Sequence, residues 1–110
     1  IGFETAKALS SKGFKVILVC RSKEKAAMAM EDIQADQPKA NLDYAIADLS
    51  SQAEIRKMAK NIHTKYPVLD VLINNAGSWY SDMQLTADGI ERQWAINHLA
   101  PFLLSHLLRM

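Results

Sequence analysis

The sequence predicts an α/β fold with a doubly wound parallel sheet, because three features occur together. Segments with apolar residues at helical spacing alternate with short apolar runs rich in β-branched residues. The short runs are separated by whole helices, which parallel strands need as crossover connections. Cap and turn residues stand at the ends of most segments. We therefore expect the order α-β-α-β-α-β-α, with right-handed crossovers and helices on both faces of the sheet.

The first part of the chain predicts a helix, a strand and a second helix. Apolar residues at helical spacing stop at Gly13, which follows a cationic last turn and is typical of a helix end. Residues 14–20 form an almost continuously apolar run, which is the composition of a strand covered on both faces. Ser22 offers an N-cap to a helix that ends by Pro38, although Lys25 stands where a capping box has an acid.

A second strand and a third helix follow. Residues 42–47 predict a more alternating strand that ends at Asp48. Ser50 or Ser51 caps the next helix, and Glu54 stands where a capping box that begins at Ser51 has its acid. A Tyr-Pro pair ends this helix. Its apolar stripe consists of Ile55, Met58, Ala59 and Ile62.

The remaining residues predict a third strand and a long final helix. Residues 71–73 are a short apolar run that leads into the sequence Asn-Asn-Ala-Gly at 74–77. A polar loop covers 78–86. The last helix is expected to begin near Ala87 or Asp88 and to continue to the end of the sequence.

Composition and charge bound the classes of function. A chain of 110 residues buries one small core, so we expect a single domain over 1–110. Its 13 basic and 12 acidic residues give no bulk electrostatic reason to expect nucleic acid or an anionic membrane as a partner. The single cysteine, Cys20, cannot form an internal disulfide, which fits a reducing compartment such as the cytoplasm. No apolar run is long enough for a membrane span, and membrane association of a longer protein stays open.

Most polar residues of chemical interest stand where strands end, and ligands of parallel α/β sheets bind at those ends. Arg21 and Ser22 follow the first strand, at the position that contacts the adenosine ribose in dinucleotide-binding folds. An acid there binds the 2′-hydroxyl, whereas an Arg accommodates a 2′-phosphate, so NADP(H) is expected rather than NAD(H). The alternative is that Arg21 is a surface residue that begins a charged helix.

The run Asn74-Asn75-Ala76-Gly77 directly after a buried type of strand is the most specific signal in the chain. Its small residues let the backbone pass close to a flat ligand, although an Asn-rich turn is the alternative. Asn97 interrupts an otherwise apolar helix and must find partners, because an unsatisfied buried amide costs about 1–3 kcal/mol. A satisfied core amide or an exposed face is the alternative for Asn97.

Several of these segments resemble the short-chain dehydrogenase/reductase family of the non-extended type. The resemblance lies in Ile-Gly-Phe-Glu-Thr-Ala-Lys-Ala-Leu at the start, in Asn-Asn-Ala-Gly, and in Gln-Trp-Ala-Ile-Asn-His-Leu. With Val-Ile-Leu-Val-Cys-Arg-Ser, the sequence is most similar to the retinol-dehydrogenase-like branch. The resemblance implies a Rossmann-type fold and an oxidoreductase that transfers a hydride between NADP(H), with NAD(H) less expected, and a small alcohol or carbonyl substrate.

The resemblance also implies a role for each site residue. Gly2 would be the third glycine of a phosphate-binding turn, where it allows the first helix to pack closely on the sheet. Asp48 and Leu49 would lie beside the adenine ring, although Asp48 also suits the turn before a capped helix. Asn97 would position a water in a proton relay to a catalytic Lys. The resemblance implies no metal site. The expected cofactor-binding residues are Gly2, Arg21, Ser22, Asp48, Leu49, Asn74, Asn75, Ala76 and Gly77.

Two groups of aromatic and other apolar residues have two possible roles each. Trp79 and Tyr80 either line a substrate cleft or cover an edge of the core. In the family, the helix that corresponds to the last one here commonly packs in a subunit interface, which implies a homo-oligomer. The burial of its apolar residues could equally be intramolecular. These residues are Trp94, Phe102, Leu103 and Leu107.

The family's catalytic Tyr-x-x-x-Lys does not occur in these residues, and neither does the first part of its phosphate-binding turn. We therefore expect a partial domain, truncated at both ends, that is inactive by itself. The alternative is a non-catalytic nucleotide-binding or interaction module derived from the same fold. A methyltransferase of related fold is disfavoured, because its site generally needs an acid where Cys20 and Arg21 stand.

The expectation of a longer protein can be tested by sequencing the DNA on both sides of the coding region. We expect the reading frame to begin upstream with Thr-Gly-x-x-x-Gly and to continue downstream into a Ser and Tyr-x-x-x-Lys. A start codon just before Ile1 together with a stop codon after Met110 would contradict this expectation and favour the non-catalytic module.

Overall fold

A computed structural model describes residues 1–109, and Met110, the last residue of the expected domain, lies outside the described residues. The chain divides into two compact units, Ile1–Ile46 and Ala47–Met110. The prediction of a single domain stays a prediction.

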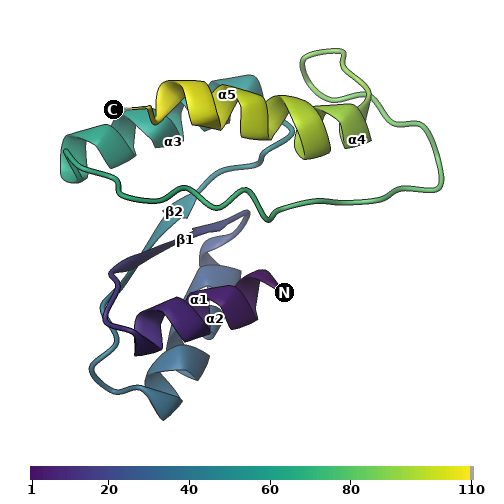
Figure 1. The fold of residues 1–110 in the computed structure, drawn as a ribbon. Coiled ribbons are helices and arrows are strands. Elements are labelled where there is room, and N and C mark those ends of the chain that lie inside the picture. The colour runs from purple at the N-terminus through teal and green to yellow at the C-terminus, as the bar shows by residue number, and fades with distance from the viewer. Residues whose placement is uncertain (110) are drawn as a thin grey trace. The chain divides into compact units, whose positions relative to one another are not determined.

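The first unit has the element order α1, β1, α2, β2 (Figure 1). Helix α1 covers Gly2–Ser11, strand β1 Val16–Cys20, helix α2 Lys23–Asp36 and strand β2 Leu42–Ile46. The two strands pair in parallel over their whole length, with Val16 opposite Leu42 and Cys20 opposite Ile46. Helix α2 is the crossover between them, as parallel pairing requires, and the predicted β-α-β arrangement is confirmed here.

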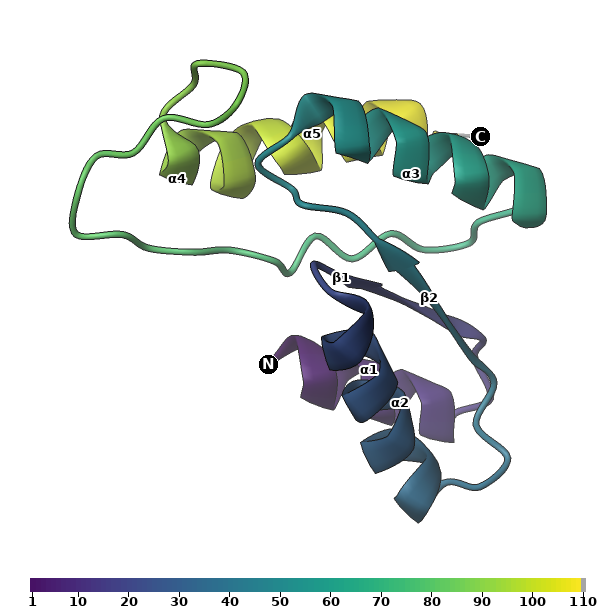
Figure 2. The ribbon, with the colours of Figure 1, turned by 180° about the vertical axis from the view of Figure 1, so that it is seen from behind.

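Helices α1 and α2 lie on the same side of the β1–β2 pair, as Figures 1 and 2 both show. Their contact with the strands buries Ala6, Ala26 and Ile33, of which Ala26 and Ile33 have no exposed surface. The two helices are also linked directly, because Lys7 in the middle of α1 forms an ion pair with Asp36 at the end of α2.

The end of α1 follows the sequence prediction. The N–H of Gly13 donates to the carbonyl of Ser10, and the N–H of Phe14 donates to the carbonyl of Leu9. These two bonds define a Schellman motif, in which the residue after the C-cap adopts the left-handed conformation, and Gly13 has φ +89°. Since Phe14 belongs to this cap and is 48% exposed, the strand begins at Val16 and not at the predicted residue 14.

The predicted cap of α2 is also present, but the burial of the strand before it differs from the prediction. The Ser22 side chain accepts a hydrogen bond from the N–H of Lys25 at 3.2 Å. The run at 14–20 was expected to be covered on both faces, yet Val19 is 42% exposed in β1. Its apolar composition therefore overstates the burial that the described residues provide.

The second unit consists mainly of two helical segments that pack against each other (Figures 1 and 2). Helix α3 covers Gln52–Lys65. The final segment is continuous and contains α4 (Arg92–Trp94), the π-helical turn η1 (Ala95–Leu99) and α5 (Ala100–Leu107). The predicted stripe of α3 is confirmed, since its buried residues are Ile55, Met58, Ala59 and Ile62. The final segment contributes Ala95, Ile96, Ala100, Leu104 and Leu108 to the buried apolar residues.

The first turn of α3 corrects the predicted capping box. Ser51 is the N-cap, and its side chain accepts from the N–H of Glu54 at 3.3 Å, as predicted. A capping box would return the Glu54 carboxylate to the N–H of Ser51. Instead, Glu54 Oε1 accepts from the N–H of Asp48 at 3.0 Å, and the N–H of Ser51 donates to the carbonyl of Asp48. Because the N–H of Ser51 is used in the turn before the helix, the Glu54 carboxylate binds the N–H of Asp48 in its place.

The predicted third strand at 71–73 is wrong for the described chain. These residues form no strand, and the described sheet contains β1 and β2 alone. Val71 is 61% exposed and Ile73 is 50% exposed. A strand is regular only when a neighbour completes its hydrogen bonds, and within residues 1–109 this segment pairs with no other strand.

The predicted start of the final helix at Ala87 or Asp88 is also wrong. Residues 86–90 form a tight turn, in which the N–H of Thr86 donates to the carbonyl of Ile90 and Gly89 has φ +73°. A left-handed residue cannot continue an α-helix, so the helix begins after it at Arg92. Glu91 is the N-cap, and its carboxylate accepts from the N–H groups of Gln93 and Trp94.

The cap of α1 gives a test of the first unit. Replacing Gly13 with Ala should lower the free energy of unfolding by about 1–2 kcal/mol, because the left-handed conformation is unfavourable for residues with a Cβ. A Cβ at this position meets no atom within 4 Å, so the cost is conformational and not steric. Urea unfolding of the natural protein that contains this chain measures the change.

The matched control is Gly13→Asn, which should cost less than Gly13→Ala, because Asn adopts the left-handed conformation more readily. Equal losses for Asn and Ala would contradict the conformational explanation.

Candidate functional site

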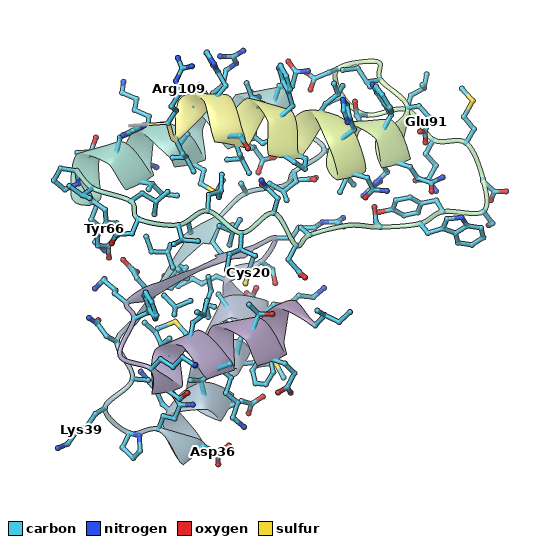
Figure 3. The ribbon with its side chains drawn as sticks, viewed as in Figure 1. Cys20, Asp36, Lys39, Tyr66, Glu91 and Arg109 are labelled. Atoms are coloured by element: carbon cyan, nitrogen blue, oxygen red, sulfur yellow. The ribbon has the colours of Figure 1, made fainter. Side chains whose placement is uncertain are left out.

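A cationic corner lies at the carboxyl end of β1, where Cys20 is the last strand residue (Figure 3). Arg21 follows it with an exposed side chain, and Ser22 follows as the N-cap of the 14-residue helix α2. The Ser22 oxygen accepts from the N–H of Lys25, so its own O–H proton is available for donation to an anion. The first N–H groups of a helix and its positive dipole end favour an anion at the same place.

The side chain of Cys20 adds no negative charge to this corner. Burial raises the pKa of the Cys20 thiol, and the nearby Lys25 ammonium opposes this only in part. The thiol is therefore neutral at pH 7, and residues 20–22 contain no carboxylate. Residues 20–22 therefore suit a phosphate next to Arg21 and contain no acid of the kind that binds a ribose 2′-hydroxyl; the nearest carboxylate along the sequence is Glu24, in the first turn of α2.

Gly2 is half-buried and is the first residue of α1. The carbonyl of Ile1 accepts from both the N–H and the hydroxyl of Thr5, which holds the first turn of the helix in place. Gly2 therefore lies at a helix N-terminus, as its predicted role requires, and that role remains a prediction.

Asp48 organises the turn between β2 and α3. Its Oδ1 accepts from the N–H of Ser50 at 2.9 Å and from the hydroxyl of Ser50 at 2.7 Å. Asp48 therefore has the turn-forming role before a capped helix that its sequence position also suited. Leu49, beside it, is half-buried. A contact of Asp48 and Leu49 with an adenine ring remains a prediction.

Residues 74–77 follow an irregular, exposed segment and not a strand. The side-chain amide of Asn74 donates to the hydroxyl of Ser105 at 3.3 Å, which connects the segment to α5. Asn75, Ala76 and Gly77 are exposed, and Gly77 does not have a positive φ. A Cβ at position 77 would lie 3.4 Å from Asn97 Oδ1, which is van der Waals contact, so the backbone here passes close to the Asn97 carboxamide.

The side chain of Asn97 holds the residue that follows this motif. Asn97 Oδ1 accepts from the N–H of Ser78 at 2.8 Å, and Asn97 Nδ2 donates to the carbonyl of Ser78 at 2.7 Å. Two antiparallel bonds of this kind replace the partner strand that Ser78 lacks in the described chain. Of the two interpretations of Asn97, the exposed face is the one observed, since Asn97 is exposed and both of its polar atoms bind the loop.

The backbone around Asn97 departs from an α-helix. Residues 95–99 form the π-helical turn η1, and the N–H of Ala100 donates to the carbonyl of Ala95. π-turns occur frequently at functional sites. Next to this turn, the hydroxyl oxygen of Ser78 is buried and has no hydrogen-bond partner among the described residues. A buried hydroxyl of this kind is normally satisfied by an ordered water or a ligand group.

Two further residues that the sequence prediction missed hold the loop after Ser78. Gln93 Nε2 donates to the carbonyl of Tyr80 at 3.0 Å, and the Arg92 guanidinium lies 4.9 Å from the centre of the Tyr80 ring. The N–H of Arg92 also donates to the carbonyl of Gln84 at 2.8 Å. The sequence feature that could have indicated this role is the position of Arg92 and Gln93 in the first turn of a helix, directly after a long polar loop.

A cavity of about 400 Å³ lies between α3 and α5, and none of the predicted site residues lines it. Its lining residues are Arg56, Ala59, Lys60, His63, Thr64 and Leu107. His63 Nε2 lies 2.6 Å from the carbonyl of Leu107 at the end of α5, which explains His63 as a helix-capping residue.

The final helix exposes part of the apolar surface that the sequence marked for burial. Trp94 is 53% exposed and stacks on His98, and Phe102 is 69% exposed, whereas Leu103 and Leu107 are half-buried. The homo-oligomer stays a prediction. Within residues 1–109, no three His, Cys, Asp or Glu residues gather as metal ligands. No helix in that range is long and apolar enough to cross a membrane.

Comparison with known sequences gives one consistent result. The sequence profile of the short chain dehydrogenase family matches residues 1–109. Human retinol dehydrogenase 11 is 42% identical over 108 residues, and retinol dehydrogenase 12 of Bos taurus is 41% identical over 108 residues. In both cases the match covers 98% of this chain and 34% of the relative, so the chain spans about a third of the length of these relatives.

Solved structures support the fold. A crystal structure of an uncharacterized protein from Mycobacterium Paratuberculosis is similar with a TM-score of 0.82 and 34% identity. The match covers 97% of this chain and 37% of that protein. A metagenomic short-chain oxidoreductase in complex with NADP is similar with a TM-score of 0.80 and 28% identity, over 96% of this chain and 48% of that one. The predicted Rossmann-type α/β class is confirmed.

The bonds between Asn97 and Ser78 give a test of the second unit. Replacing Asn97 with Ala removes both bonds and should lower the free energy of unfolding by about 1–2 kcal/mol, since each exchanges with water. Asn97→Asp should cost at least as much, because it places a carboxylate against the Ser78 carbonyl. Urea unfolding of the natural protein that contains this chain measures both changes.

Asn61 provides the matched control, because it is an exposed Asn on the surface of α3. Asn61→Ala should change stability by no more than about 0.5 kcal/mol. If Asn97→Ala behaves like Asn61→Ala, the two bonds do not hold the loop.

Proposed function

Because the chain belongs to the short-chain dehydrogenase family, we propose that it forms part of an NADP(H)-dependent oxidoreductase that acts on an alcohol or carbonyl compound. The observation that carries this proposal is the pair of hydrogen bonds between Asn97 and Ser78, the residue directly after the Asn-Asn-Ala-Gly run. It joins the two most specific motifs of the chain into one local structure. The names of the relatives, retinol dehydrogenases 11 and 12, support an alcohol as the reduced substrate.

The corner at the end of β1 supports NADP(H) in preference to NAD(H). The exposed guanidinium of Arg21 and the hydroxyl of Ser22 would hold the 2′-phosphate, and the neutral thiol of Cys20 would not repel it. The NADP in the similar metagenomic oxidoreductase supports the same choice. Asp48 and Leu49 would contact the adenine ring. The backbone at Gly2 and at Asn74, Asn75, Ala76 and Gly77 would pass along the rest of the cofactor.

The bound nicotinamide supplies the hydride donor or acceptor, and the residues of this chain position groups around it. Asn97 would serve the proton relay through the backbone of its π-turn, because both polar atoms of its side chain bind Ser78. The buried hydroxyl of Ser78 offers a further partner for a relay water. Asn97 thus fixes the loop with its side chain, and its backbone turn would hold the water.

A comparison of the binding affinities for NADPH and NADH tests the assignment of Arg21. Arg21→Ala in the natural protein that contains this chain should raise the Kd for NADPH by roughly 10- to 100-fold, the loss expected for one hydrogen-bonded charge. The Kd for NADH should change little, because NADH has no 2′-phosphate. Fluorescence titration of both cofactors gives the two constants.

Arg109→Ala is the matched control, since Arg109 is also an exposed Arg and belongs to no proposed contact. Its NADPH and NADH affinities should match those of the unchanged protein. A parallel loss of NADPH and NADH affinity in Arg21→Ala would contradict a contact with the 2′-phosphate.

The proposed activity itself is tested by following NADPH oxidation at 340 nm with aldehydes as substrates. We expect turnover that depends on the aldehyde. Tight NADPH binding without turnover for any alcohol or carbonyl compound would contradict the proposal and support a nucleotide-binding module without catalysis.

A further inference from the structure

Trp79 is the most exposed tryptophan side chain of the described residues, at 78%. Trp residues are rarely left in water, because burial of a large aromatic ring contributes strongly to stability. Trp79 follows Ser78 directly, so it lies next to the residue that Asn97 holds. The proposed function gives no role to this side chain.

The backbone on both sides of Trp79 is fixed. Before it, the N–H and the carbonyl of Ser78 are both bonded to the Asn97 side chain. After it, the carbonyl of Tyr80 accepts from Gln93 Nε2 at 3.0 Å. Because both neighbours of Trp79 are held, its Cα–Cβ bond is presented from a fixed part of the loop, and the side chain is exposed.

The Tyr80 ring shows the contrast between the two neighbouring aromatic residues. Tyr80 is half-buried under the Arg92 guanidinium, 4.9 Å from the ring centre, and its place is explained by that contact. Trp79 is exposed, although both of its neighbours in the sequence are held. The loop therefore uses one aromatic residue to anchor itself and presents the other outward.

We propose that Trp79 forms an apolar wall of the substrate site and contacts the apolar body of the alcohol or carbonyl substrate. This inference rests on the proposed function, in which the π-turn at Asn97 and the hydroxyl of Ser78 would hold the relay water, so that the residue after Ser78 would lie close to the reacting atoms of the substrate. Binding sites for small molecules are lined mainly by aromatic and apolar side chains that are already in place before binding. A held, outward-facing Trp meets this requirement, and its indole N–H can also donate to a polar group of the substrate.

The size of the substrate separates this role from a structural one. The indole ring contributes little to the binding of a two- or three-carbon aldehyde, because so short a substrate covers little of the ring. A long or cyclic apolar aldehyde covers the ring and loses that contact when it is removed. Trp79 is therefore expected to determine specificity and not the rate of the chemical step.

The experiment compares propanal with decanal, each with saturating NADPH, in the natural protein that contains this chain and in its Trp79→Ala variant. The kcat/KM for decanal should fall by about 10- to 100-fold, the range for lost apolar contacts in a pocket. The kcat/KM for propanal should fall by less than about threefold, and most of the decanal effect should lie in KM. Trp79→Phe keeps an aromatic face and should recover most of the decanal activity.

Met83→Ala is the matched control, because Met83 is 77% exposed in the same loop but is not placed between held neighbours. Its decanal-to-propanal ratio should match that of the unchanged protein. The Kd for NADPH, measured for each variant, should also be unchanged.

The outcomes separate this inference from the proposed function. Activity on both aldehydes with an unchanged ratio in Trp79→Ala would overturn the role of Trp79 and leave the oxidoreductase proposal intact. A drop in unfolding free energy with equal losses on both aldehydes would show that Trp79 covers an edge of the core. Absence of turnover with any carbonyl compound would overturn the proposed function, and this inference with it.

Discussion

The pair of hydrogen bonds between the Asn97 carboxamide and the backbone of Ser78 is the constraint on which the candidate site depends. It connects an irregular loop to a helix across 19 residues of sequence. Each bond contributes only about 0.5–1.5 kcal/mol net, because water competes for both partners. The value of the pair is therefore geometric, since two opposed bonds fix the position and the orientation of one peptide unit at once.

Three features stand next to that arrangement. A Cβ at Gly77 would lie 3.4 Å from Asn97 Oδ1, so the backbone of the motif passes within van der Waals contact of the carboxamide. The helix around Asn97 takes a π-turn, and Ile96 beside it is buried. Trp79 follows the held peptide directly and is exposed. The family motif Asn-Asn-Ala-Gly and the helix with Asn97 thus depend on each other physically, although their sequences are far apart.

The sequence predicted the parts of the fold that arise from local interactions. The glycine stop at Gly13, the cap at Ser22 and the buried stripe of α3 depend on residues within one or two helical turns, and all three are confirmed. The strand at 71–73 was wrong, because pairing depends on segments distant in sequence and apolar composition alone does not supply a partner. Asn97 was identified as a residue of interest, but its partner was not, since a backbone peptide carries no signature in the sequence. The predicted start of the last helix was wrong, because Gly89 adopts the left-handed conformation and so belongs to a turn before the helix.

The two units also divide the proposed work of the chain in chemical terms. The first unit offers a fixed positive charge and a helix N-terminus next to a neutral thiol, and in the proposal this corner would distinguish cofactors by charge. The second unit offers a peptide held by Asn97, a buried hydroxyl at Ser78 and an exposed indole ring, which would bind water and apolar surface. Charge at the 2′-phosphate would select the cofactor without contacting the reacting atoms, because the 2′-phosphate takes no part in hydride transfer. Selection of the substrate needs groups close to those atoms, and the loop that Asn97 holds is the part of this chain suited to provide them.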